Sequence, residues 1–64
     1  MEVKTAQAVL KIAFTLISLF SLDNIQAKEV ETYAKAHANA WVLKRKEESE
    51  VRSYIENYIY EIKD

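Results

Sequence analysis

Hydrophobic residues dominate the first third of the chain. Between residues 3 and 22 they recur at helical spacing in two adjacent stripes, which together cover most of the helix circumference. A helix that is apolar nearly all round is buried on several sides, and one neighbouring helix cannot cover it. We therefore expect residues 3–22 to form a central helix that a second copy of the chain helps to cover. The side chains expected in this dimer core are Val9, Ile12, Phe14, Leu16, Ile17, Leu19 and Phe20.

Two polar residues, Asp23 and Asn24, interrupt the apolar pattern. Asp23 is a favourable helix N-cap, and Gln26 three positions later completes a variant of the capping box. This arrangement predicts a second helix over residues 24–43. Its apolar positions are weaker and rich in alanine, and such small side chains allow a neighbouring helix to approach closely.

The last third of the chain carries the clearest amphipathic stripe, which consists of Val51, Tyr54, Ile55, Tyr58, Ile59 and Ile62. Residues 44–50 before it contain nothing apolar. Because heptad phase runs through this polar segment, one helix over residues 24–63, about 60 Å long, is one interpretation. The other is a break near Ser49, which would cap a separate helix over residues 49–63. We favour the break, since an uninterrupted helix of that length is rare in a small domain.

The composition reinforces an all-helical fold. The chain lacks glycine and proline, which tight turns and β-hairpins require. Its 64 residues form one domain at most. A core of this size seldom contributes more than about 3–5 kcal/mol to stability, so small domains usually add disulfides, a metal ion or oligomerisation. Because the chain has no cysteine, it cannot form a disulfide, and association with another chain remains as the source of added stability. We predict an all-α protein with a single domain over residues 1–64, in which a helical hairpin or three-helix unit forms a homodimeric helical bundle.

The chain offers few groups for chemistry. His37 is the only histidine, and no second ligand stands at a metal-binding spacing from it, so we expect it to pack between Tyr33 and Trp41. Paired carboxylates such as Glu47 and Glu48 lie in the most solvated stretch, which does not suit general acid–base catalysis. The sequence therefore predicts a non-enzymatic protein with no catalytic residue, no cofactor and no metal.

Aromatic residues suggest a surface for a protein partner. Tyrosine and tryptophan are enriched at interfaces because their rings bury area while their polar ends stay hydrated. The alternative is that the tyrosines pack on the first helix, of the same or of a second subunit. We predict an adaptor, inhibitor or regulator, for instance of a transcription factor or another host control protein. The expected partner-binding residues are Trp41, Tyr54, Tyr58 and Tyr60.

Nucleic-acid binding by a helical dimer is the first alternative. The net charge of −1 gives no overall attraction to phosphates. Acidic residues at 47, 48 and 50 also adjoin the basic cluster, within a Debye length of about 8–10 Å. The residues that would contact phosphates are Lys44, Arg45, Lys46 and Arg52.

A membrane-associated or exported peptide is the further alternative, based on the charge-free residues 12–22. These 11 residues fall short of the roughly 20 that a membrane span needs. The triplet at 25–27 resembles a signal cleavage site, but cleavage there would leave a short remnant with no disulfide to hold it. We therefore favour a buried core helix and a cytoplasmic protein.

Overall fold

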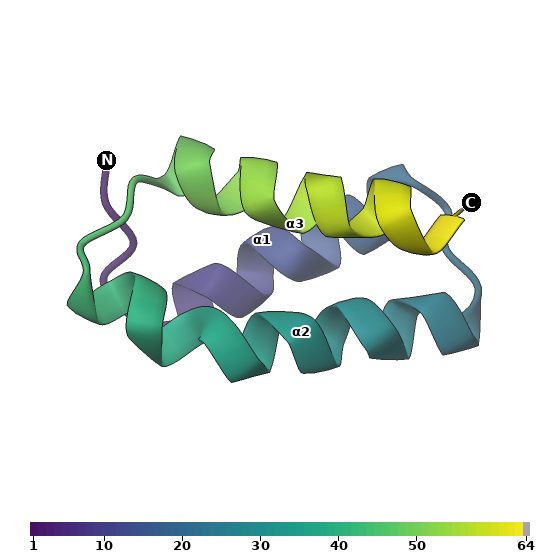
Figure 1. Cartoon of the computed structure of the whole chain (residues 1–64), viewed down its shortest axis with the longest axis horizontal. Helices are drawn as coiled ribbons and strands as arrows, with labels where there is room; N and C mark the ends of the chain where they lie inside the picture. The colour runs from purple at the N-terminus through teal and green to yellow at the C-terminus, as the bar shows by residue number, and fades with distance from the viewer. Residues whose placement is uncertain (64) are drawn as a thin grey trace.

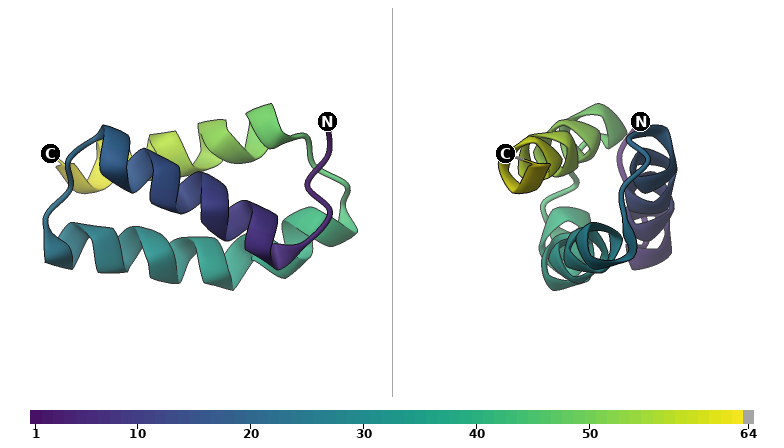
Figure 2. Two further views of the ribbon diagram at one scale, coloured as in Figure 1. Left: turned by 180° about the vertical axis from the view of Figure 1, so that it is seen from behind. Right: turned by 90° about the vertical axis from the view of Figure 1, so that its right-hand side faces the viewer.

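Three helices make up the fold. A computed structural model describes residues 1–63 and contains α1 (Ala6–Leu19), α2 (Asn24–Leu43) and α3 (Glu48–Lys63). The helices run side by side, with α2 antiparallel to both α1 and α3 (Figure 1). Viewed along the bundle they occupy the corners of a triangle (Figure 2). The prediction of an all-helical chain is confirmed in its three-helix form, and the continuous helix over 24–63 does not occur.

The core lies on the axis of the bundle, and each helix contributes one stripe to it. In α2 the alanines at 34 and 38 are buried, which matches the expected close approach of a neighbouring helix. The single chain therefore builds a core of its own, and α1 faces it with only one of its two apolar stripes. The buried residues are Val3, Val9, Ala13, Leu16, Val30, Ala34, Ala38, Trp41, Val51, Ile55 and Ile59.

A non-glycine residue in the left-handed conformation ends α1. Ser21 has a φ of 52°, and its N–H donates to the Ser18 carbonyl at 3.2 Å. The Leu22 N–H reaches back to the Ile17 carbonyl at 3.3 Å, which completes a Schellman motif. The expected cap of α2 is present, since the Asp23 carboxylate accepts from the Gln26 N–H at 2.8 Å.

The same motif ends α2 and separates it from α3. Arg45 has a φ of 55°, and the Lys46 N–H donates to the Trp41 carbonyl at 3.0 Å. Helix α3 then begins at Glu48, and its first turn is held by the Glu50 carboxylate, which accepts from the Glu47 N–H at 3.4 Å. The expected cap at Ser49 is therefore wrong, because this residue already lies inside the helix.

We expect Ser21→Gly and Arg45→Gly to stabilise the protein. A residue with a Cβ in the left-handed conformation destabilises the fold by about 1–2 kcal/mol, and glycine removes this strain. Part of the gain is offset because glycine has the larger conformational entropy in the unfolded chain. Each substitution should raise the free energy of unfolding by about 0.5–1 kcal/mol in urea titrations followed by circular dichroism. Ser18→Gly, inside α1, is the control and should lower it by a similar amount. Destabilisation by both turn variants would contradict this account.

The N-terminal segment packs along the α2–α3 turn instead of extending α1. The Val3 N–H donates to the Lys46 carbonyl at 2.9 Å, and the Glu48 N–H donates to the Met1 carbonyl at 2.8 Å. Val3 itself is buried. The predicted start of the first helix at residue 3 is thus wrong. The helix begins after Thr5, whose hydroxyl accepts from the Ala8 N–H at 3.1 Å and caps it.

Candidate protein-binding surface

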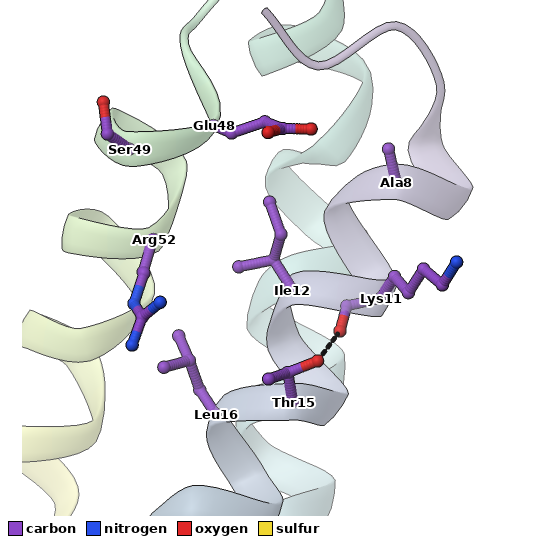
Figure 3. A pocket seen from close by; sticks show the side chains of 8 residues that line it. All are labelled: Ala8, Lys11, Ile12, Thr15, Leu16, Glu48, Ser49 and Arg52. Atoms are coloured by element: carbon purple, nitrogen blue, oxygen red, sulfur yellow. Dashed lines mark hydrogen bonds between the residues drawn. The ribbon is translucent and has the colours of Figure 1, made fainter. Parts of the chain in front are cut away.

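A groove of about 620 Å³ opens between α1 and α3. Its apolar floor comes from Ala8, Ile12 and Leu16 of α1, and Ile12 points across toward α3 (Figure 3). Leu16 is buried, Ile12 and Ala8 are half-buried, and Thr15 lies at the edge with its hydroxyl donating to the Lys11 carbonyl at 2.9 Å. An apolar floor inside a polar rim suits a partner side chain or helix better than a charged ligand.

Charged residues of α3 border this groove. Glu48 extends above the floor and Arg52 lies beside it, whereas the Lys11 amine of α1 points away (Figure 3). The Arg52 guanidinium is 3.3 Å from the Glu56 carboxylate one turn further along α3. The rim on α3 therefore alternates negative, positive and negative charge.

Leu19 and Tyr60 extend this surface toward the C-terminal end of the bundle. Leu19 follows Ala8 by three helical turns and so lies on the same side of α1, where its side chain is 64% exposed. Tyr60 is also exposed, and its ring meets the edge of Phe20 at 5.5 Å between centroids. We call this surface the α1–α3 face; it comprises Ala8, Ile12, Thr15 and Leu19 of α1 with Glu48, Arg52, Glu56, Tyr60 and Lys63 of α3.

A second shallow groove lies on the outer side of α1. Phe14 is 50% exposed at its edge, next to the half-buried Leu10. The groove measures about 630 Å³ and is lined by Thr5, Gln7, Ala8, Leu10, Lys11 and Phe14, and we call it the Phe14 groove. Helix α1 thus presents apolar side chains on two flanks that the rest of the chain does not cover.

Stacked aromatic rings close the side of the bundle between α2 and α3. Trp41 stacks on Tyr54 with ring centroids 5.6 Å apart, and Tyr33 stacks on Tyr58 at 4.1 Å. His37 lies against Trp41 at 5.3 Å, in the aromatic packing that its spacing predicted. Because α2 and α3 are antiparallel, these pairs form successive rungs, which we call the aromatic seam.

Lys46 lies at one end of the aromatic seam. Its ammonium is 5.8 Å from the centre of the Tyr54 ring and 3.7 Å from the Glu50 carboxylate. Hydrogen bonding and charge attraction from the Tyr54 hydroxyl raise the pKa of the Lys46 amine, and Glu50 adds a further attraction. This cation is therefore engaged within the protein.

The structure divides the four residues predicted to contact a partner. Trp41 is only 7% exposed, and Tyr54 and Tyr58 are half-buried in the aromatic seam, where they pack on α2. Tyr60 stands apart on the α1–α3 face, 57% exposed. Helical periodicity showed which side of α3 is apolar, but it did not show that α2 would cover most of it.

The residues predicted for a dimer core are also divided. Val9 and Leu16 belong to the core of the single chain, because they lie on the stripe that α1 turns toward α2 and α3. Ile12, Ile17 and Phe20 are half-buried against that core. Only Phe14 and Leu19 are exposed, and they lie on the two opposite flanks of α1.

The four basic residues of the nucleic-acid alternative form no continuous surface. Lys46 and Arg52 are engaged with Glu50 and Glu56 on α3. Lys44 and Arg45 lie exposed in the α2–α3 turn. A gel shift at low salt tests whether those two suffice, since binding carried by phosphate contacts weakens steeply as salt is added.

We expect stability to fall at alkaline pH because of Tyr33. Burial raises the pKa of its hydroxyl above the ordinary 10.0, and the nearby charge of Glu61 adds to this effect. The unfolded chain then releases the Tyr33 proton at a lower pH than the folded chain does, so rising pH stabilises the unfolded state first. The contribution is fully present below pH 10 and is lost as the pH rises through the raised value.

Urea titrations between about pH 8 and 11 measure this loss. Tyr33→Phe should lose less of its unfolding free energy above pH 10 than the wild type does, while the two pH profiles stay parallel below pH 9. Parallel profiles over the whole range would show that Tyr33 does not contribute.

Within residues 1–63, no helix combines the length and apolar character that crossing a membrane requires. No group of three or more potential ligands among these residues is placed to bind a metal ion. Comparisons with models of protein families, with curated proteins and with solved structures find no match to this chain.

Proposed function

We propose that this protein acts without catalysis, by binding a second copy of itself and a protein partner whose activity it alters. The observation that carries the proposal is the uncovered apolar surface of α1. Phe14 is 50% exposed on one flank of the helix and Leu19 is 64% exposed on the other. Each extends an apolar patch on its own flank, Phe14 beside the half-buried Leu10 and Leu19 on the stripe of Ile12, and a contiguous apolar patch marks a binding site more often than a single exposed residue does.

Two grooves on one helix allow two separate contacts. The α1–α3 face has an apolar floor and a charged rim, which suits a helix lying along it. The Phe14 groove has a single large exposed ring beside polar side chains. The two grooves meet at Ala8 and Lys11, but Leu19 and Phe14 lie on opposite flanks of α1. A self-associated form that covers Leu19 would therefore still expose Phe14 to a different protein.

Self-association is tested by light scattering on the wild-type chain over a concentration series from about 1 µM to about 500 µM. We expect the mass to rise from that of one chain toward that of two. A mass of one chain throughout the series would contradict self-association.

Binding of a different protein is tested with three tagged chains used to capture proteins from lysate. Wild type is compared with Phe14→Glu, which places a charge at the edge of the Phe14 groove. Leu43→Glu is the matched control, because Leu43 is 82% exposed at the end of α2 and away from both grooves. A specific partner must be held by wild type and by Leu43→Glu but lost from Phe14→Glu. The same proteins on all three chains would count against this groove.

A further inference from the structure

The apolar stripe on the α1–α3 face has a spacing that is unchanged when the helix direction is reversed. Its residues are Ala8, Ile12, Thr15 and Leu19, separated by four, three and four positions. When two such helices meet antiparallel about a two-fold axis, each residue faces the one at the mirrored position. Leu19 then lies over Ala8 of the second copy, and Ile12 lies over Thr15. The exposed large side chain meets a small half-buried one at the edge of the groove.

The charges on α3 have a matching property. Along this side of the helix they read Glu48, Arg52, Glu56 and Lys63, with signs that alternate from negative to positive. Reversing the direction of the row exchanges every sign. Two copies of α3 that meet antiparallel with Arg52 near Glu56 of the second copy place Glu48 opposite position 60, one turn before Lys63. A parallel, in-register meeting of the same rows would place like charges together.

One two-fold arrangement satisfies both patterns. Helices α1 and α3 run parallel to each other (Figure 1). A two-fold axis across them, in the plane of the contact, places α1 on α1 and α3 on α3, each pair antiparallel. An axis along the helices would instead place α1 on α3, with Ile12 facing the charged side chain of Arg52. The apolar stripe would then no longer face the apolar stripe of the second copy, and the charged row would no longer face the charged row.

From these patterns we infer that two copies of this chain dock antiparallel through their α1–α3 faces, with Leu19 of each copy seated over Ala8 of the other. The inference rests on the proposed self-association and specifies its geometry. Its occupant is a second copy of the chain, because the α1 stripe complements itself in spacing and the α3 row complements itself in the order of its charges. The Phe14 side chain, on the opposite flank of α1, remains outside the contact.

Cross-linking between introduced cysteines tests this geometry cleanly, because the chain has no cysteine of its own. Ala8→Cys and Leu19→Cys chains are prepared separately, mixed, and treated with a short bismaleimide. We expect a covalent dimer that joins the two different chains. Each variant alone should link far less, since identical positions lie about 16 Å apart along antiparallel helices at 1.5 Å per residue. Ala8→Cys mixed with Leu43→Cys is the control and should not link.

Light scattering provides a second readout that does not depend on cross-linker reach. Leu19→Glu should raise the dimer dissociation constant by about 100-fold or more, because each dimer loses two buried leucines. Leu43→Glu should leave it unchanged. Circular dichroism should show the helix content of the wild type in both variants, since both positions are exposed in the single chain.

The outcomes separate the inference from the proposed function. A wild-type dimer that shows no link between positions 8 and 19 and tolerates Leu19→Glu would overturn the antiparallel geometry, while self-association would stand. A wild-type chain that stays monomeric would overturn both. Joining of positions 8 and 19 together with loss of the dimer in Leu19→Glu would support both.

Discussion

Leu16→Ala should lower the free energy of unfolding by about 2–5 kcal/mol, the largest effect expected at any position in α1. Leu16 is only 1% exposed although it lines the groove, because its side chain belongs to the core of the bundle. Truncation removes apolar burial and leaves a void that rigid helix backbones cannot fully close. A domain of this size has about 3–10 kcal/mol of stability in total, so the variant should be partly unfolded even at room temperature.

Thermal and urea unfolding followed by circular dichroism measures this loss. Leu43→Ala is the matched control, because it deletes the same atoms from a side chain that is 82% exposed. It should change the unfolding free energy by no more than about 0.5 kcal/mol. Equal midpoints for Leu16→Ala and wild type would show that α1 does not turn this stripe toward the core.

Sequence reasoning predicted the helices most accurately where a polar cap accompanies the periodic pattern. Asp23 sets the start of α2 at the predicted residue because its carboxylate binds a specific backbone N–H in the first turn. Val3, in contrast, continues the apolar spacing of α1 while lying outside the helix. Periodicity cannot distinguish an apolar residue in the first turn of a helix from one in an extended segment that precedes the helix and packs beside it.

The conformation of the two turns between helices could not be predicted from the sequence, for a different reason. Glycine is the usual sign of a left-handed residue after a helix, and here Ser21 and Arg45 adopt that conformation instead. Neither serine nor arginine favours the left-handed conformation, so the residue type does not predict it. The hydrogen bonds of each Schellman motif, together with the half-buried Leu22 after the first turn and the half-buried Lys46 after the second, hold the conformation.

The candidate site was predictable in part. The excess of apolar surface on α1 follows from the sequence, and Phe14 and Leu19 do remain exposed. Which apolar side chains stay free depends on which helices cover the others, and this is a property of the packing. Pairing of α2 with α3 moves Trp41 into the core and leaves Tyr60 outside. One aromatic set in the sequence thus becomes two regions that differ in exposure, one in the core and one on the surface.

Trp41→Ala tests that division directly, and it should lower the free energy of unfolding by about 3–5 kcal/mol. Trp41 is 7% exposed, and its ring stacks on Tyr54 and on His37. Its removal opens the aromatic seam at the end nearest the α2–α3 turn, where Lys46 and the N-terminal segment also meet. Stacking beyond plain burial adds about 0.5–1.5 kcal/mol for each lost pair, so the expected cost falls at the upper end of the range.

Circular dichroism is the appropriate probe for this variant, because the only tryptophan of the chain is removed. Tyr60→Ala is the control; Tyr60 is 57% exposed and its main aromatic contact is the edge of Phe20, so it should cost about 1 kcal/mol or less. Trp41→Phe should fall between the two, since it keeps a ring in the aromatic seam. A residue that serves chiefly to contact a partner would behave in the opposite way: Trp41→Ala would then unfold like the wild type and lose only binding.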